Sequence, residues 1–220
     1  MYKGFNLKDL FNPERRRCSK LSYIKKHQRI TLNGNLRDLV EKLTNKEFAE
    51  LVRRCVNLDY SDGLYNLAHI AARYGTVKKF RSIIKRRGDL LNSQGLLERT
   101  PLHMAALYGR LKMTKFILRC GANIEAPDSC GDFPLFNACR NGHLNIVKAL
   151  MTVDKFIIYD QDKLHGNSFI NAIDFACLYR LDKSAKLVEF LIQQGVFISQ
   201  SVRNLDLSNA PKLRKLIREN

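Results

Sequence analysis

Residues 99–109 read RTPLHMAALYG, and the main features of this stretch occur again at a nearly fixed spacing on both sides. Residues 66–75, NLAHIAARYG, carry the same His, Ala-Ala pair and Gly 34 residues earlier. Residues 133–142, FPLFNACRNG, carry the same Pro-Leu, first Ala and Gly 33 residues later. Ordered positions that recur twice at one spacing indicate that a structural unit of about 33 residues is stacked along the chain.

Each unit predicts two short helices joined by a tight turn. Thr100 suits the residue that caps the first helix, and Pro101 suits its first position, where a backbone N–H would have no partner. The Ala-Ala pair lets neighbouring units approach closely, and Gly109 can adopt the left-handed conformation that ends a helix. Residues 112–119 predict a second helix with an apolar stripe on one side and basic residues on the other.

The Thr-Pro-Leu-His-x-Ala-Ala pattern with this period resembles the ankyrin repeat. The resemblance implies an all-α ankyrin-repeat solenoid of helix-turn-helix units with short hairpin loops and, in this chain, a basic N-terminal extension. About four repeats cover residues 58–200, and the fourth, at 171–180, is diverged and follows an insertion of about five residues. A solenoid of this kind presents an extended concave surface in place of a single active-site pocket.

The segments outside the clear repeats are assigned from charge and local signals. Residues 1–35 form the basic N-terminal extension. Residues 36–57 predict two helices that act as an N-terminal cap or a degenerate repeat, and within them Thr44 and Glu47 have the spacing of a capping box. Residues 201–220 predict a C-terminal capping helix.

Charge is distributed unevenly along the chain. Lys and Arg outnumber Asp and Glu by 38 to 21, and residues 1–120 carry 26 basic and 10 acidic side chains, a net of +16. Residues 121–220 carry 12 and 11, a net of +1. Such an excess attracts acidic proteins, nucleic acid or anionic lipid, and the alternative is a solvated face plus a disordered basic arm. The predicted basic patch consists of Arg15, Arg16, Arg17, Lys78, Lys79, Arg86 and Arg87.

The cellular location of the protein is inferred from features that the sequence lacks. No apolar run approaches the roughly 18 residues that span a bilayer, and the first ten residues lack the apolar core of a signal peptide. The six cysteines show no Cys-x-x-Cys spacing, so free thiols in a reducing compartment are expected. We therefore expect a cytoplasmic or nuclear protein, with a weakly ordered arm over residues 1–30 that contains a candidate nuclear import signal.

Catalytic, cofactor and metal sites are not expected. The sequence has neither a Gly-rich phosphate loop nor a Gly-x-Ser-x-Gly motif, and no histidines and cysteines stand at metal-ligand spacing. His69 and His103 occupy the histidine of the repeat motif, where a ring nitrogen can bond to backbone groups between repeats. The chain is therefore predicted to be non-enzymatic and to hold neither a cofactor nor a metal.

The residues that the repeat leaves free are the candidates for partner binding. In ankyrin repeats, the two residues after the Ala-Ala pair and the hairpin tips face the concave groove. Tyr recurs at one of these positions in three of the four repeats, and it supplies a large rigid face with a polar tip. The alternative is that these rings only cover the adjacent alanines. The predicted partner-binding residues are Tyr65, Arg73, Tyr74, Leu97, Arg99, Leu107, Tyr108, Asp132, Arg140, Asn141, Leu178 and Tyr179.

Together these features predict a non-catalytic protein-protein interaction module: an adaptor, inhibitor or scaffold subunit that binds another protein through its concave groove. An acidic surface on the partner would suit the net charge, and the chain by itself is expected to be a monomer. The alternative function is nucleic-acid or ribonucleoprotein binding through the basic N-terminal half. Only Tyr23 and His27 interleave the first basic cluster, which is sparse for a platform on which bases stack.

Overall fold

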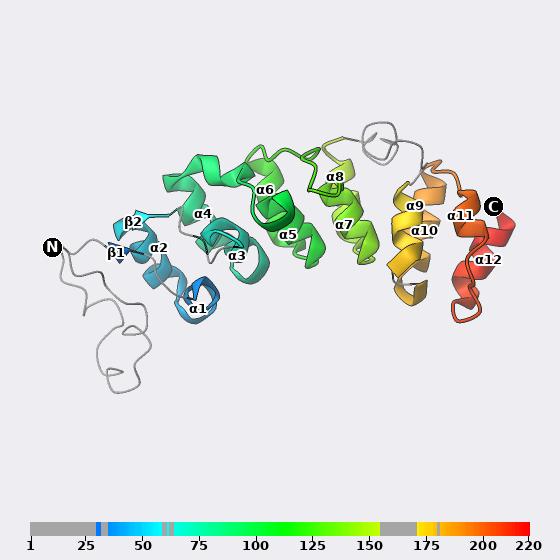
Figure 1. The fold of residues 1–220 in the computed structure, drawn as a ribbon, viewed down its shortest axis with the longest axis horizontal. Helices are drawn as coiled ribbons and strands as arrows, with labels where there is room; N and C mark the ends of the chain where they lie inside the picture. The colour runs from blue at the N-terminus through cyan, green and yellow to red at the C-terminus, as the bar shows by residue number, and fades with distance from the viewer. Residues whose placement is uncertain (1–29, 32–34, 59–60, 62–63, 155–170, 180) are drawn as a thin grey trace. The chain divides into compact units, whose positions relative to one another are not determined.

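A computed structural model describes residues 30–31, 35–58, 61, 64–154, 171–179 and 181–220 (Figure 1). These residues are mostly helical, which confirms the predicted all-α class, and they form twelve α-helices. The basic arm with Arg15, Arg16 and Arg17 lies outside the described residues. The chain divides into two compact units, unit 1 (Met1–Leu96) and unit 2 (Leu97–Asn220).

Unit 1 contains two helix pairs. In the first pair, α1 (Leu36–Lys42) is followed by α2 (Asn45–Arg54), and in the second, α3 (Leu67–Tyr74) is followed by α4 (Val77–Arg86). The first helices pack on each other, as do the second helices, α2 on α4. Residues 36–54 therefore stack on the next pair as a repeat would.

The helix starts of unit 1 depend on side chains that satisfy backbone N–H groups. Thr44 and Glu47 form the predicted capping box: the Glu47 N–H donates to Thr44 Oγ1 at 3.2 Å, and the Thr44 N–H donates to Glu47 Oε2 at 2.9 Å. Asn66 begins α3 in place of the motif's Thr, and its Oδ1 accepts from the N–H groups of Ala68 and His69 at 3.0 and 3.3 Å. These bonds fix where each helix begins.

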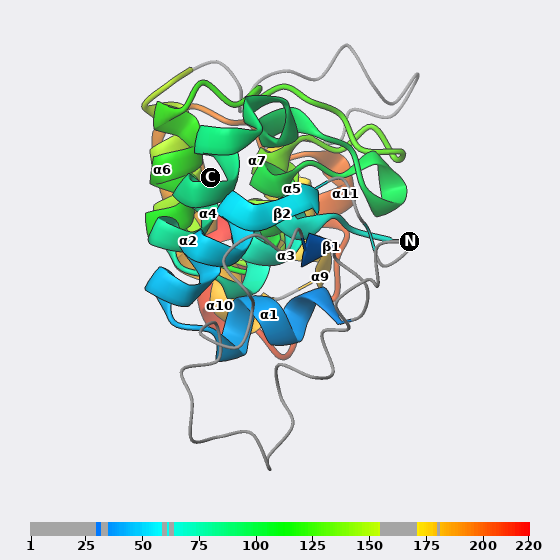
Figure 2. The same ribbon diagram turned by 90° about the vertical axis from the view of Figure 1, so that its left-hand side faces the viewer.

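A short pair of strands in unit 1 was not predicted from the sequence. β1 (Ile30–Thr31) pairs in parallel with β2 (Cys55–Asn57), and Figure 2 shows the two lying together. Helices α1 and α2 lie between β1 and β2 in the chain. They return the chain to the start of the pair, so that both strands run in the same direction. Parallel strands need a crossover of this kind, and two short helices supply it here.

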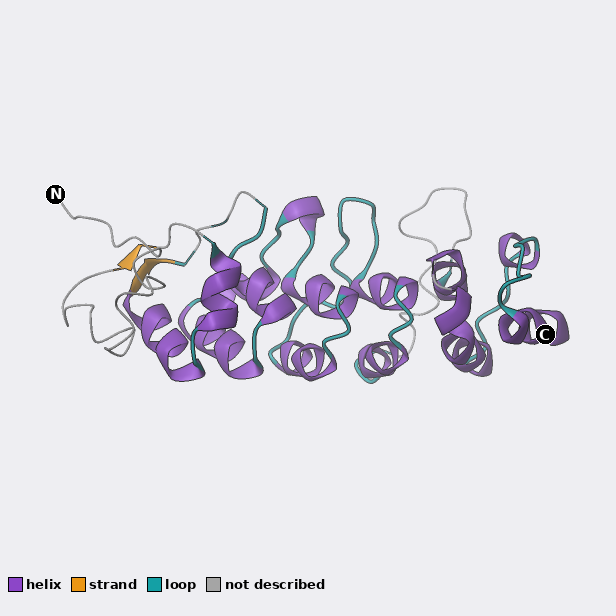
Figure 3. Ribbon diagram, turned by 90° about the horizontal axis from the view of Figure 1, so that it is seen from below, coloured by secondary structure: helices purple, strands orange, loops and turns teal. Residues whose placement is uncertain are grey.

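Unit 2 holds three helix pairs followed by a short and a longer helix. The first helices stack in sequence, α5 on α7 and α7 on α9, and α6 packs beside α8. Figure 3 shows the loop between α6 and α7 extending away from the helices. The bounds are α5 (Pro101–Leu107), α6 (Leu111–Arg119), α7 (Pro134–Arg140), α8 (Leu144–Met151), α9 (Ala172–Tyr179), α10 (Leu181–Gln193), α11 (Gln200–Arg203) and α12 (Pro211–Glu219).

The repeat positions behave in unit 2 as their chemistry predicts. Ala105 and Ala106 are fully buried between neighbouring helices. Gly109 has a φ of +68°, the left-handed value that lets α5 end in a tight turn. The ring of His143 fills the space beside it, since a side chain at Gly109 would come within 2.8 Å of the imidazole.

Two 3₁₀ segments stand between α4 and α5, η3 (Gly88–Asn92) and η4 (Leu96–Glu98). Within η4, Leu97 and Glu98 have φ values of 57° and 56°, which residues with a side chain rarely adopt. Among the described residues, no helix is both long and apolar enough to cross a membrane.

Candidate protein-binding surface

The ends of the first helices in unit 2 present the residues that follow the buried alanines. Tyr108, directly after α5, is 40% exposed, and Leu107 before it is half-buried. After α7, the Asn141 side chain bonds back to the carbonyl of Asn137 at 3.0 Å. The side chains of Leu178 and Tyr179, the equivalent residues of α9, lie outside the description.

Tyr74, the equivalent tyrosine in unit 1, has different surroundings. The guanidinium carbon of Arg37 lies 4.4 Å from the centroid of its ring, and that of Arg73 lies 4.5 Å from it. Arg37 is held in turn by Glu41, with Nε 3.1 Å from Oε2. Stacking of guanidinium groups on a tyrosine ring is attractive, so Tyr74 and Arg73 act as part of a packed cluster.

Tyr65 is half-buried beside the motif histidine of the same repeat. Its ring centroid lies 5.5 Å from that of His69. The loop at Gly95 packs against the ring, because a side chain there would come within 2.8 Å of a Tyr65 ring carbon. Tyr65 therefore supports the loop of its own repeat and exposes only part of its ring.

The motif histidine of α5 has the structural role that the sequence predicts. The Thr100 N–H donates to His103 Nδ1 at 3.1 Å, so Nδ1 is the unprotonated ring nitrogen. Nε2 then carries the proton and donates to the carbonyl of Asp132, 3.0 Å away in the next repeat. His103 thus joins two neighbouring repeats through its ring.

Three of the predicted partner-binding residues of unit 2 are used within the fold. Arg99 Nε lies 3.1 Å from Oδ2 of Asp128, whose side chain is fully buried. Arg140 Nη2 lies 2.6 Å from Oδ2 of Asp132, whose side chain is 3% exposed. Asp132 is therefore an interior residue, and Arg99 and Arg140 fix the geometry of the loops.

Asp128 organises the loop that carries these pairs. Its Oδ1 accepts from the backbone N–H groups of Cys130 and Asp132 at 2.9 and 3.1 Å. The neighbouring Ser129 N–H donates to the carbonyl of Leu97 at 2.9 Å, which ties one loop to the next. The Leu97 side chain is 43% exposed, and its backbone has a rarely adopted conformation. The edge formed by these loops therefore presents an apolar side chain to solvent.

The second cluster of the predicted basic patch does not form one exposed surface. Lys79 is only 5% exposed, its amine donates to the carbonyl of Val40, and burial lowers its pKa. Arg86 donates to the carbonyl of Val52, and Arg87 binds Asp89 through Nε at 2.9 Å and Nη2 at 2.7 Å. Consecutive residues of a helix point in different directions. Basic residues that are adjacent in the sequence therefore divide between the core and the surface.

Lys78, Arg81 and Lys85 remain exposed on α4, and this helix carries no acidic residue. Arg81 and Lys85 belong to the same basic cluster of the sequence but were left out of the predicted patch. The helical period of α4 shows that they belong to it, because both lie opposite the buried Phe80 and Ile83.

Within the described part of the chain, no group of three His, Cys, Asp or Glu side chains could hold a metal ion. Cys120, Cys130, Cys139 and Cys177 are free thiols, and the side chains of the other two cysteines lie outside the described residues. Burial raises the pKa of Cys177 to about 12 and raises that of Cys139 as well, so both side chains pack as small apolar groups.

Comparison with known proteins identifies the repeat. Residues 102–151 match the family model "Ankyrin repeats (many copies)". The chain is 32% identical over 80 residues to the probable E3 ubiquitin-protein ligase XBOS33 of rice, which is 30% of this chain and 15% of that protein. It is 34% identical over 91 residues to the putative E3 ubiquitin-protein ligase XBAT31 of Arabidopsis thaliana, 40% of this chain and 19% of that protein.

A third relative is the NF-kappa-B inhibitor alpha of chicken, 35% identical over 60 residues, 27% of this chain and 19% of that protein. The matched segment therefore spans about a fifth or less of each of these three relatives. What is shared is the repeat.

Proposed function

We propose that this chain, which is an ankyrin-repeat protein, is a non-catalytic adaptor, inhibitor or scaffold subunit that binds a partner protein through the first-helix side of its repeats. The observation that carries the proposal is the exposed side chain of Tyr108 at the end of α5, two residues after a fully buried Ala-Ala pair. A large aromatic ring held on a rigid helix end is the kind of group that anchors protein interfaces.

The partner would contact unit 2 along the ends of α5, α7 and α9. Leu107 and Tyr108 supply apolar and aromatic surface, Asn141 supplies a polar group, and Leu97 supplies an exposed apolar side chain at the loop edge. Leu178 and Tyr179 are proposed as the third pair of the series. Arg99, Asp132 and Arg140 position the loops beneath this surface. In unit 1, Tyr65, Arg73 and Tyr74 are proposed to form a separate contact surface of the same kind.

The relatives support the class of function at the level of their names. One is named as an inhibitor of another protein, which agrees with a binding role. The others are named as ubiquitin ligases, but the matched segments cover 15 and 19% of them, so their activity is not assigned to this chain. We place the protein in the cytoplasm or nucleus, where its free thiols would persist.

The test uses the full chain. Partners captured by the wild-type protein are identified, and their affinities for wild type and for Tyr108→Ala are compared. Truncation of an aromatic anchor costs about 2 kcal/mol, so the affinity should fall at least about tenfold. Phe197→Ala is the matched control, since Phe197 is 50% exposed and is not one of the proposed contacts. An equal loss of affinity in both variants, or no loss of affinity in either, would refute the proposed surface.

A second candidate function is nucleic-acid binding by the basic half. The exposed Lys78, Arg81 and Lys85 on the acid-free α4 favour it. Binding to phosphates weakens steeply and log-linearly with salt, whereas an interface anchored by Tyr108 responds weakly. A salt series on the captured complex, with and without nuclease treatment, separates the two functions.

A further inference from the structure

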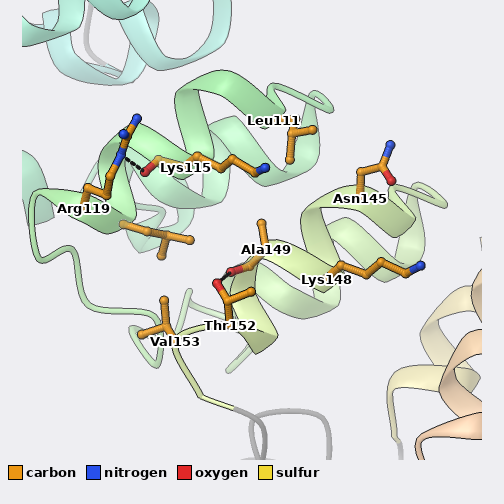
Figure 4. A pocket seen from close by; sticks show the side chains of 9 residues that line it. Leu111, Lys115, Arg119, Asn145, Lys148, Ala149, Thr152 and Val153 are labelled. Atoms are coloured by element: carbon orange, nitrogen blue, oxygen red, sulfur yellow. Dashed lines mark hydrogen bonds between the residues drawn. The ribbon is translucent and has the colours of Figure 1, made fainter.

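A groove of about 600 Å³ runs between the second helices of two neighbouring repeats in unit 2, α6 and α8. Figure 4 shows the two helices side by side, with the lining side chains along the gap between them. The helix ends that carry Tyr108 and Asn141 contribute none of the lining, so this groove is distinct from the surface proposed above.

The interior of the groove is apolar. Leu111 and Leu118 line it from α6, and Ala149 lines it from α8. Val153, just beyond α8, closes one end and is 57% exposed. Leucine and valine surface that remains open to water is a favourable place for an apolar side chain of another molecule.

The rim of the groove is cationic. Lys115 and Arg119 stand on α6 and Lys148 on α8, and none of the lining residues is acidic. Arg119 Nε donates to the carbonyl of Lys115 at 3.1 Å, which holds its side chain at the end of α6. The amine of Lys148 lies 4.7 Å from the ring centroid of Phe190 on α10, and Figure 4 shows this side chain pointing away from α6. Lys115 and Arg119 on one side of the groove and Lys148 on the outer side of α8 together create a local positive potential.

We propose that this groove binds an acidic amphipathic segment of a partner protein, with leucine-like side chains in the groove and carboxylates against Lys115, Arg119 and Lys148. The chemistry of the lining favours this occupant over nucleic acid. No lining residue is aromatic, so bases have nothing to stack on, and an apolar floor offers a sugar-phosphate backbone no partner. A helical segment suits the site because residues four apart share one face.

The experiment measures binding of a defined probe to the full chain by fluorescence anisotropy. The probe is a labelled peptide of about fifteen residues, or about four helical turns, with leucines four apart among glutamates and aspartates. Two reference peptides are compared with it, one with lysine in place of every acid and one with glycine in place of every leucine. The expected order of affinity is the acidic leucine peptide first, the glycine peptide well below it, and no binding of the lysine peptide.

Variants then locate the probe on the protein. Lys115→Glu combined with Lys148→Glu, and separately Val153→Asp, should each weaken binding at least about tenfold, since they oppose the charge and the apolar contact respectively. All three residues are exposed, so melting temperatures should stay close to that of wild type. Lys112→Glu is the matched control, because Lys112 is an exposed α6 residue that does not line the groove. It should change binding little.

Tyr108→Ala separates this site from the proposed first-helix surface, and it should leave probe binding unchanged. Equal effects of Lys112→Glu and the groove variants would show non-specific charge attraction and overturn the proposal. So would equal affinity for the leucine and glycine peptides, loss of binding in Tyr108→Ala, or binding of a single-stranded oligonucleotide that displaces the peptide and shows the same sensitivity to Lys115 and Lys148.

Discussion

Arg140 Nη2 lies 2.6 Å from Asp132 Oδ2, and this ion pair joins the loop before α7 to the end of α7. The Asp132 side chain is 3% exposed, and its backbone carbonyl accepts the proton of His103 from the preceding repeat. The guanidinium carbon of Arg140 also lies 5.1 Å from the ring centroid of Phe175 in the following repeat. A single polar cluster therefore connects three consecutive repeats.

We expect Arg140→Ala to destabilise the protein. It leaves the nearly buried Asp132 carboxylate without its cation, and removing one partner of a buried pair costs about 3 kcal/mol. Urea unfolding of wild type and variant measures the difference. Arg87→Ala is the control, since Arg87 and Asp89 form a comparable pair whose side chains are 37% and 62% exposed, and little change is expected there. Similar losses in both variants would show that burial does not decide the effect.

Gly109→Ala should also lower stability. The residue has a φ of +68°, and its new side chain would stand 2.8 Å from the ring of His143, so both backbone and packing oppose it. A loss of at least about 1 kcal/mol in the free energy of unfolding is expected. Gly88→Ala is the matched control, because nothing lies within 4 Å of a side chain there and its φ is not left-handed. It should be neutral or slightly stabilising, and a loss as large as that of Gly109→Ala would contradict the argument.

Glu50 predicts a dependence of stability on pH. Hydrogen bonds from Arg53 and Arg54 hold its pKa below the ordinary value of 4.5. A lowered folded-state pKa contributes stability above the unfolded-state pKa, and this contribution is lost as pH falls through the folded-state value. Glu50→Gln should therefore be less stable than wild type at neutral pH, by under about 1 kcal/mol because the site is partly exposed. The difference in stability between wild type and Glu50→Gln should disappear in acid.

Melting curves of the two proteins across an acid series provide the measurement for Glu50. Glu125→Gln serves as the control, since Glu125 is exposed on a loop of unit 2 and should show no such gap. A difference between wild type and Glu50→Gln that persists below the folded-state pKa would mean that lost packing, and not the charge, causes it.

The sequence predicted the parts of this fold that depend on local chemistry. The period placed α5 at Pro101, the turn at Gly109 and the second helix within one residue of its observed start at Leu111. The sequence also assigned the His103 ring to a hydrogen bond between repeats, because the repeat motif places that ring next to the backbone of the following repeat.

The features that were missed depend on residues that the repeat period does not relate. The pair of Arg99 with Asp128 joins positions 29 apart, and each residue alone resembles a surface charge. The same limit applies to Lys79, which points inward from a basic run, and to the groove between α6 and α8. The residues that line this groove alternate with buried residues along α6 and α8. Only the packed structure shows that they form one surface.

The two tyrosines at one repeat position should respond differently to truncation. Tyr74 is half-buried with Arg37 and Arg73 at 4.4 and 4.5 Å from its ring, whereas Tyr108 is 40% exposed. Tyr74→Ala removes the ring on which both guanidinium groups stack and should cost about 2 kcal/mol of folding stability. Tyr108→Ala should change stability by no more than about 0.5 kcal/mol.

Urea unfolding of both variants measures this difference, and Tyr74→Phe refines it. Phenylalanine keeps a ring face for the two cations, so Tyr74→Phe should retain most of the stability that Tyr74→Ala loses. If Tyr74→Phe and Tyr74→Ala are equally unstable, the hydroxyl and not the stacked ring holds the cluster together. If Tyr108→Ala proves as destabilising as Tyr74→Ala, its ring belongs to the core, and the first-helix surface of unit 2 loses its proposed anchor.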